Sequence, residues 1–315
     1  MDRFRKLAIS STVATFILVA IGGVVRATKS GLGCGTDWPD CSGRIIPLLN
    51  SRPVVIEFSH RIMASIVLLL LGALALLAFR HYRQAPRILW PSVAAFGLVI
   101  VQALLGAVVV VLELHAVSVV LHLATAMTLV GVLVYLVAAS SPVGGPTPPR
   151  FDRSISKQAS VTATAVLLLL LSGSYVTGRD AGLVFPDWPL MNGQLVPDLS
   201  IGPYAIHFAH RALAALAGVF VFLTSARVMK RKGDMPVAYR LAHVLAGGFA
   251  LQVVIGAANV WTQLNPIAVS LHLIVGTVLW ASLVGIAVVA HPAITGSGAQ
   301  APSAHRRPVL ESGAA

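Results

Sequence analysis

Eight apolar segments, each long enough to cross a bilayer, constrain this chain more than any other feature of its sequence. A transmembrane helix needs about 20 consecutive, mainly apolar residues. Segments of this kind lie at approximately 7–25, 54–79, 89–112, 116–139, 158–177, 204–226, 241–261 and 267–290. Only 11% of the 315 residues are charged, against about 25% in an average soluble domain. The sequence therefore predicts an all-α integral membrane protein, and it excludes a water-soluble enzyme, a disordered chain and a disulfide scaffold.

The basic residues predict the orientation of these helices. The chain carries 23 Lys and Arg against 11 Asp and Glu, a net charge of +12 that could indicate a nucleic-acid partner. When the N-terminus is placed in the cytoplasm, 16 basic residues fall on the cytoplasmic side, five in outer loops and two within spans. The positive-inside rule then predicts that both termini are cytoplasmic. The charge thus reports the topology of a multi-pass cell-membrane protein, and we expect no nucleic-acid partner.

The second half of the chain repeats the first at a spacing of 150 residues. The matched polar motifs are Asp37-Trp38-Pro39 with Asp187-Trp188-Pro189, His60-Arg61 with His210-Arg211, Gln102 with Gln252, and Leu121-His122-Leu123 with Leu271-His272-Leu273. These matches are informative because Trp, His and Arg rarely align by chance in membrane helices. Four spans per half is an even number, so both halves enter the membrane from the same side. We therefore expect two pseudo-symmetric four-helix bundles, related by an axis along the membrane normal.

A segment rich in Pro, Gly and Ser separates the two repeats and predicts a linker. We place the N-terminal bundle at 1–140, a cytoplasmic linker at 141–157 and the C-terminal bundle at 158–290. The remaining residues, 291–315, are expected to form a disordered cytoplasmic tail.

Four histidines fall at matched depths within the predicted spans. His60 and His122 each lie about 10 Å below the outer end of helices that run in the same direction, so their imidazoles can face each other. His210 and His272 repeat this arrangement. Buried histidines bonded to carbonyl groups are the plain alternative, but ionisable residues inside a membrane mark functional sites. Zinc would need a third or fourth protein ligand, whereas a facing pair suits the two axial positions of a heme iron. The sequence predicts one heme in each half.

Two further histidines lie near these pairs. His115 precedes His122 by seven residues and His207 precedes His210 by three, so each shares a helical face with its neighbour. Each could donate a hydrogen bond to a heme propionate, or could simply lie at the membrane interface.

The halves differ at position 57, because the counterpart of Glu57 is His207. Glu57 is the only carboxylate within a predicted span, and it shares a helical face with His60. Arg61 could pair with Glu57 at i, i+4. That pair could be purely structural, or Glu57 could be an acid/base or charge-stabilising group beside the first heme. Propionate binding is a further role for Arg61, and it is the role we expect for Arg211, which lacks a glutamate partner.

The chain has two cysteines, Cys34 and Cys41, which lie among turn-forming residues in the first outer loop. On the oxidising side of the membrane we expect them to form a disulfide. Phe185 and Met191 stand at the matching positions, so the second half cannot form this bond. The disulfide could be a structural staple or a redox-active pair, and the two hypotheses have equal weight.

Taken together and in order, these motifs resemble those of the heme A synthase family. The resemblance rests on the EFSHR motif at 57–61, the DWP loops, the LHL motifs, the eight spans and the outer-loop cysteines, and it covers 7–290. It implies an oxidoreductase that converts a methyl group of heme O to a formyl group by successive hydroxylations. The product, heme A, serves the terminal cytochrome oxidase.

The resemblance also implies residue roles. His60 and His122 would ligate the iron of the substrate heme, with Glu57 as the catalytic carboxylate. His210 and His272 would ligate a heme b cofactor for electron transfer. Some family members carry a second cysteine pair in the third outer loop, where this chain has Phe185 and Met191, so we expect no mechanism that needs that pair.

The main alternative is a diheme b-type membrane cytochrome that only transfers electrons. The restriction of Glu57 and the cysteine pair to one half argues against it. A transporter would need helices broken at mid-membrane, but the prolines lie mainly in loops. The expected partners are heme O, heme A, membrane lipid and an electron-transfer partner. Heme O is poorly soluble, which favours an association with heme O synthase, and the sequence is compatible with a homo-oligomer.

Overall fold

The computed structural model of the protein describes residues 3–141 and 151–291. Within these ranges the chain forms eight helices: α1 (Arg3–Ala27), α2 (Arg52–His81), α3 (Pro86–Val111), α4 (Ala116–Ala139), α5 (Arg153–Gly178), α6 (Gly202–Met229), α7 (Pro236–Trp261) and α8 (Pro266–Val289). All eight are long and apolar enough to cross a membrane. The predicted eight-span, all-α fold is confirmed.

The helix starts follow from local sequence. A proline stands in the first turn of α2, α3, α6, α7 and α8, where its fixed φ suits the helix and its missing N–H costs nothing. The fifth helix instead begins at an aspartate cap, because the Asp152 carboxylate accepts hydrogen bonds from the backbone N–H groups of Ser154 and Ile155. This cap starts α5 at Arg153, inside the segment 141–157 that the sequence analysis predicted as a linker.

Two predictions about the ends of the bundles fall on residues outside the described ranges. The central part of the linker, 142–150, and the tail from 292 onward are not among the described residues.

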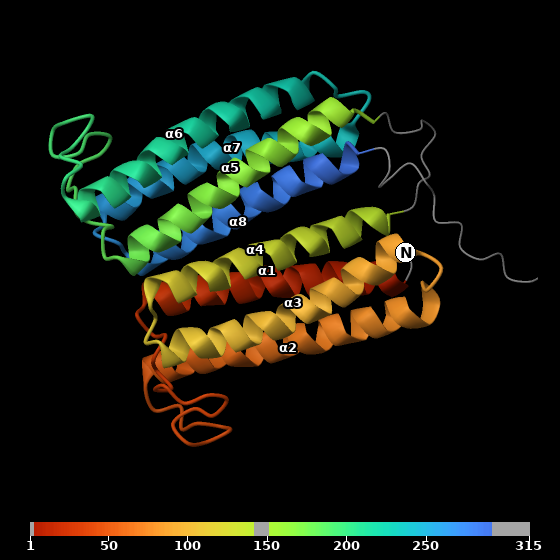
Figure 1. Ribbon diagram of the computed structural model, residues 1–315, viewed down its shortest axis with the longest axis horizontal. Coiled ribbons are helices and arrows are strands. Elements are labelled where there is room, and N and C mark those ends of the chain that lie inside the picture. Colours follow the sequence, from red (N-terminus) through yellow and green to blue (C-terminus); the bar gives the residue numbers. More distant parts are fainter. Residues whose placement is uncertain (1–2, 142–150, 292–315) are drawn as a thin grey trace, which may run out of the picture.

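The helices form two groups of four that follow each other along the chain (Figure 1). In the first group α1 packs against α2, α2 against α3, α3 against α4 and α4 against α1; α5–α8 repeat this ring. Each ring has its own apolar core, with Leu71, Leu74 and Leu133 at the centre of the first and Leu245 and Leu283 in the second. In each ring the second and fourth helices therefore stand diagonally across from each other.

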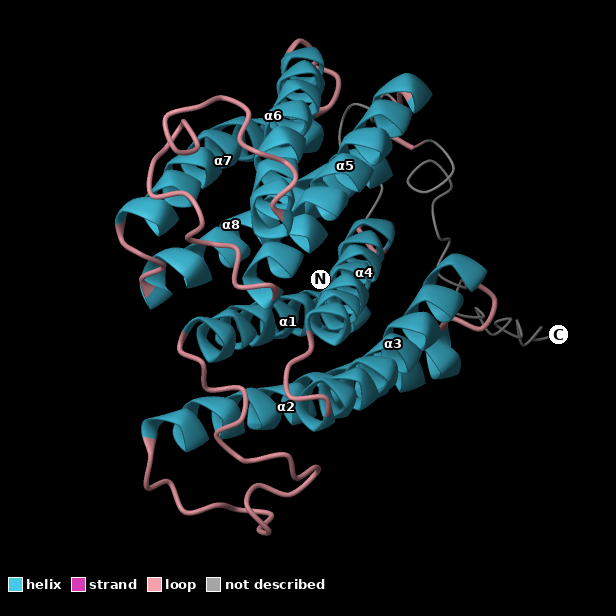
Figure 2. Ribbon diagram, turned by 60° about the vertical axis from the view of Figure 1, so that its left-hand side comes forward, coloured by secondary structure: helices cyan, strands magenta, loops and turns pink. Residues whose placement is uncertain are grey.

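The two rings meet through α1 and α4 of the first and α5 and α8 of the second, as the turned view also shows (Figure 2). The indole of Trp280 donates a hydrogen bond to the Met127 carbonyl across this seam, at 2.9 Å. Close to the long loops, α4 and α5 are in tight contact at Ala116 and Gly178. A Cβ atom added to Gly178 would lie only 2.7 Å from Cβ of Ala116. Small residues at such a contact allow membrane helices to approach each other.

Two long loops, 28–51 and 179–201, lie at the same end of the helices, at the left of Figure 1. We call this end the long-loop end. The loops are built alike: each contains a cis peptide bond, at Trp38-Pro39 and at Trp188-Pro189. Each also contains an isolated antiparallel bridge, between Cys41 and Arg44 and between Met191 and Gln194. The DWP repeat of the sequence therefore corresponds to a repeated loop structure.

Candidate functional site

The four matched histidines lie on the even-numbered helices: His60 on α2, His122 on α4, His210 on α6 and His272 on α8. Each lies two turns or so from the helix end nearest the long loops. The two histidines of each ring lie at the same level, on helices that stand diagonally across from each other. The structure thus brings together the two pairs that the sequence predicted, one pair in each ring.

Each of these imidazoles packs against a glycine of the preceding helix. A Cβ built on the glycine would approach the ring Cε1 at 3.1 Å for Gly22 and His60, 3.4 Å for Gly106 and His122, 2.9 Å for Gly173 and His210, and 3.3 Å for Gly256 and His272. Three of these distances are shorter than ordinary van der Waals contact, which starts at 3.4 Å. The glycines therefore let each ring lie directly on a neighbouring backbone, and that contact fixes the ring position.

The ring nitrogens do not all have the same partners. Nδ1 of His60, His122 and His272 is buried and has no hydrogen-bond partner among the described residues. The Leu18 carbonyl faces His60 without reaching hydrogen-bond geometry. In contrast, Nδ1 of His210 lies 2.8 Å from the Ser172 hydroxyl. One of the four otherwise similar rings is therefore held by a side-chain hydrogen bond.

Two glutamines bind the backbone at the second histidine of each pair. Nε2 of Gln102 donates to the His122 carbonyl at 3.0 Å, and Nε2 of Gln252 donates to the His272 carbonyl at 2.9 Å. In both glutamines Oε1 is buried and lacks a partner within the described parts of the chain. These glutamines join α3 to α4 and α7 to α8 at the level of the histidines.

Glu57 is 4% exposed, and both of its carboxylate oxygens have partners. Oε1 accepts a hydrogen bond from Arg61 at 2.6 Å, which confirms the predicted i, i+4 ion pair. Oε2 accepts from the backbone N–H of Cys34 at 2.8 Å. The carboxylate therefore connects α2 directly to the loop that carries the two cysteines.

The two predicted arginines hold the DWP loops by their backbone carbonyls. The carbonyl acceptors of Arg61 are Asp37, Pro39 and Asp40, and those of Arg211 are Asp187, Pro189 and Leu190. Five guanidinium N–H groups in a fixed fork suit such multiple acceptors. The propionate role of both arginines stays a prediction, and the backbone carbonyls that both guanidinium groups bind belong to the loops.

His207 occupies the place of Glu57 in the second ring and is 6% exposed. Its Nε2 accepts a hydrogen bond from Nε of Arg211 at 3.1 Å, since a guanidinium can only donate. Its Nδ1 therefore carries the proton, which it donates to the Ala181 carbonyl at 2.8 Å. Both ring nitrogens are used within the protein. His115 lies exposed at the start of α4, and the propionate role of both histidines stays a prediction.

Cys34 and Cys41 form the predicted disulfide, and both are buried against Val54 and Phe58 of α2. The residues that replace them, Phe185 and Met191, are equally buried. Phe185 packs on Tyr204 and His207, with ring centroids 4.8 and 5.3 Å apart. In the second loop an apolar pair of side chains therefore takes the place that the disulfide has in the first loop.

The aspartate of the second DWP motif has a structural role outside the membrane spans. The Asp187 carboxylate accepts hydrogen bonds from the backbone N–H groups of Gly193 and Asn192, each at 2.8 Å. The bond from Gly193, followed by that from Asn192, lowers the pKa of this carboxyl below its usual value. The ionised form therefore stabilises the turn at neutral pH.

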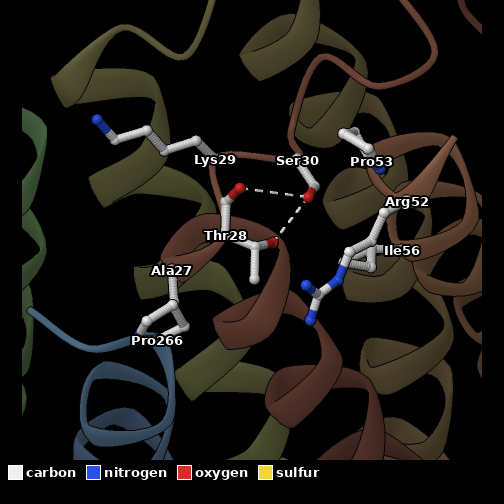
Figure 3. A pocket seen from close by; sticks show the side chains of 8 residues that line it. All are labelled: Ala27, Thr28, Lys29, Ser30, Arg52, Pro53, Ile56 and Pro266. Carbon is white, nitrogen blue, oxygen red and sulfur yellow. Dashed lines mark hydrogen bonds between the residues drawn. The ribbon is translucent and has the colours of Figure 1, made fainter.

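A cavity of about 350 Å³ opens at the long-loop end, at the seam between the two rings (Figure 3). It is lined by Ala27, Thr28, Lys29, Ser30, Arg52, Pro53, Ile56 and Pro266. The Arg52 side chain points from α2 toward Thr28 (Figure 3). None of the predicted site residues lines this cavity, so the histidine pairs are a separate feature inside the helix rings.

Sequence reasoning missed several residues that contact the histidines. Gly22, Gly173 and Ser172 lie where the repeat is offset by 151 residues instead of 150, because the second half has one residue fewer than the first half before its DWP motif. Gln102 and Gln252 were visible as a repeated pair. Their positions one turn before Gly106 and Gly256 could have indicated a shared face toward the histidines.

The protein is therefore an eight-span membrane protein in which each of two four-helix rings holds a pair of partly buried histidines on diagonal helices. A family model described as "Cytochrome oxidase assembly protein" matches residues 5–284. The chain belongs to this family.

Curated relatives agree with this assignment. The chain is 30% identical over 294 residues to the heme A synthase of Alkalihalophilus pseudofirmus, which covers 89% of this chain and 95% of the relative. It is 28% identical over 252 residues to the heme A synthase of Shouchella clausii, covering 78% and 84%. It is 30% identical over 217 residues to that of Halalkalibacterium halodurans, covering 67% and 72%. The family resemblance predicted from the motifs is confirmed.

Proposed function

We propose that this protein is a heme A synthase, which oxidises a methyl group of heme O to the formyl group of heme A in the cell membrane. The observation that carries the proposal is the pair of glycine-packed histidines in each ring, together with Glu57 beside the first pair. Family membership and the names of the relatives support it.

The two histidines of each pair would hold the iron of a heme. Each pair stands on diagonal helices of one ring, where facing side chains of a four-helix bundle hold cofactors. Nδ1 of His210 is occupied by Ser172, which leaves Nε2 of that ring for an iron. The described residues contain no group of three or more His, Cys, Asp or Glu able to hold a metal. Two imidazoles per site therefore suit a porphyrin-bound iron better than a bare zinc ion.

In the first ring, His60 and His122 would hold the substrate heme O between α2 and α4. Glu57 precedes His60 by one helical turn, so its carboxylate would place a fixed negative charge on the substrate side of α2. The ion pair with Arg61 and the bond from Cys34 keep that carboxylate in one position. The apolar ring excludes water from the reacting group.

In the second ring, His210 and His272 would hold heme b, which supplies one-electron transfer when bound. Conversion of a methyl to a formyl group is an oxidation, and a heme in the second ring would provide an electron carrier beside the substrate ring. The two rings meet through α4 and α8, the helices that carry His122 and His272. This contact supports a cofactor role for the second ring, with both heme sites toward the outer face of the membrane.

The test compares Glu57→Gln with His207→Gln, the same substitution at the matching position. In cells that supply heme O, we expect Glu57→Gln to lower heme A formation by about 100-fold or more, the usual size of an acid/base contribution, without loss of bound heme. His207→Gln should retain heme A formation. Heme extraction and mass analysis of membranes measures the outcome. Unchanged heme A formation in Glu57→Gln would show that the carboxylate is not catalytic.

The same extraction separates the enzyme from a diheme cytochrome, because a cytochrome would yield bound heme b but no heme A. For the cofactor, His272→Ala should lose the six-coordinate b-type absorption spectrum. Persistence of that spectrum in His272→Ala and in His210→Ala would contradict the assignment of the second ring.

A further inference from the structure

The two rings differ by one hydrogen bond at a proposed iron ligand. All four histidine rings lie on a glycine backbone, and three of them have a buried Nδ1 without a partner. His210 alone among these four has a side-chain partner, the Ser172 hydroxyl at 2.8 Å. Ser172 precedes Gly173, so the residue that contacts Nδ1 is next to the residue on which the ring rests.

The direction of this hydrogen bond follows from the serine itself. The Ser172 hydroxyl has one proton, and it lies 2.8 Å from the Leu169 carbonyl of its own helix. Because a carbonyl can only accept, the hydroxyl donates to Leu169 and accepts from His210. Nδ1 of His210 therefore carries the proton, and the lone pair of Nε2 is available to an iron.

The first ring cannot form this bond. Gly22 is the counterpart of Gly173, so the residue in place of Ser172 is Ile21, which has no polar side-chain atom. The loss is not compensated by another side chain, since Nδ1 of His60 is without a hydrogen bond in the described structure. The difference therefore falls on the first histidine of each pair, and the second histidines, His122 and His272, are alike.

We propose that Ser172 is a positioning residue that makes the second ring retain its heme, whereas the first ring, without such a bond, can exchange its heme. This inference rests on the proposed function. An acceptor on the Nδ1 proton orients a ligating imidazole and raises its basicity. A more basic ligand strengthens the bond to ferric iron and lowers the reduction potential of the heme. A cofactor must stay bound, whereas a substrate heme must enter and its product must leave.

The experiment uses the full-length protein with its hemes, and compares Ser172→Ala with the conservative Ser172→Thr. In Ser172→Ala we expect heme b affinity to fall by about 10-fold or more, measured as faster transfer of heme to excess apomyoglobin. The reduction potential of the b-type heme should shift upward in a redox titration. Ser172→Thr keeps the hydroxyl and should restore both values toward those of the wild type.

The converse variant, Ile21→Ser, introduces the hydroxyl into the first ring and should slow release of heme from that ring. Unchanged potential and unchanged transfer rate in Ser172→Ala would overturn the proposal, while leaving the proposed function intact. Failure of the proposed function has a different signature, since the wild-type protein would then form no heme A from heme O. A Cys34–Cys41 disulfide and a normal melting temperature in Ser172→Ala exclude misfolding as the cause of heme loss.

Discussion

The two rings share one set of contacts around the second histidine and differ around the first. On the α3–α4 side and the α7–α8 side, the glycine, the glutamine and the histidine are the same. On the α1–α2 side and the α5–α6 side, three features change: Glu57 becomes His207, the disulfide becomes Phe185 and Met191, and Ile21 becomes Ser172. The contacts around the second histidine are therefore the same in both rings, whereas those around the first histidine differ between the rings.

This comparison separates structural roles from chemical ones. The arginines Arg61 and Arg211 hold their loops in the same way in both rings, so holding the loop requires neither a carboxylate nor a disulfide. Whatever only the first ring can do must instead come from Glu57, the cysteines or the missing serine.

Loss of the loop-binding arginine should cost more in the first ring than in the second. Arg61→Leu leaves the buried carboxylate of Glu57 without its charged partner, and breaking a buried pair in this way costs about 3–5 kcal/mol. Arg211→Leu leaves neutral acceptors, His207 and loop carbonyls, unpaired, at a cost of about 1–3 kcal/mol. Thermal unfolding in detergent, followed by circular dichroism, measures both.

Arg179→Leu is the control, because Arg179 is exposed at the end of α5 and should change the stability by less than about 0.5 kcal/mol. Equal losses in Arg61→Leu and Arg211→Leu would mean that the Glu57 charge adds nothing to the loop contact.

Exchange of the disulfide for the apolar pair of the second ring tests what the disulfide does. Cys34→Ser/Cys41→Ser should lower the stability by about 2–3 kcal/mol, as expected for a short closed loop. Cys34→Phe/Cys41→Met should lose less, because Phe185 and Met191 support the same bridge in the second loop. We expect this variant to keep heme A formation, measured by heme extraction.

If the Phe/Met variant kept its stability and lost heme A formation, the cysteines would have a redox role that the apolar pair cannot replace. The Ser/Ser variant distinguishes that result from a loop that has simply unfolded.

Much of this structure could be predicted from the sequence, because membrane spans need long apolar runs and because Trp, His and Arg matches are rare. The eight helices, the pairing of the histidines, the Glu57–Arg61 ion pair and the disulfide are examples. The contacts of the glycines and of Ser172 could not be predicted from the sequence, because they depend on which faces of the helices turn toward each other. Helix amphipathicity does not report those faces when lipid and core are both apolar.

The glycines beneath the histidines should show a graded effect that follows the available space. An added Cβ meets the ring at 2.9 Å on Gly173 but only at 3.4 Å on Gly106. Overpacking costs about 1–3 kcal/mol, while alanine gains about 1 kcal/mol over glycine within a helix. Gly173→Ala should therefore destabilise by up to about 2 kcal/mol and perturb the b-type spectrum, whereas Gly106→Ala should be nearly neutral.

Gly247→Ala supplies the matched control, because nothing lies within 4 Å of a Cβ at that position of α7. It should raise the melting temperature slightly, through helix propensity alone. A spectrum of Gly173→Ala identical to that of Gly247→Ala would show that the ring of His210 moves aside without cost. In that case the position of the ring would depend on Ser172 more than on the glycine, and the rings would differ in their hydrogen bonds but not in their packing.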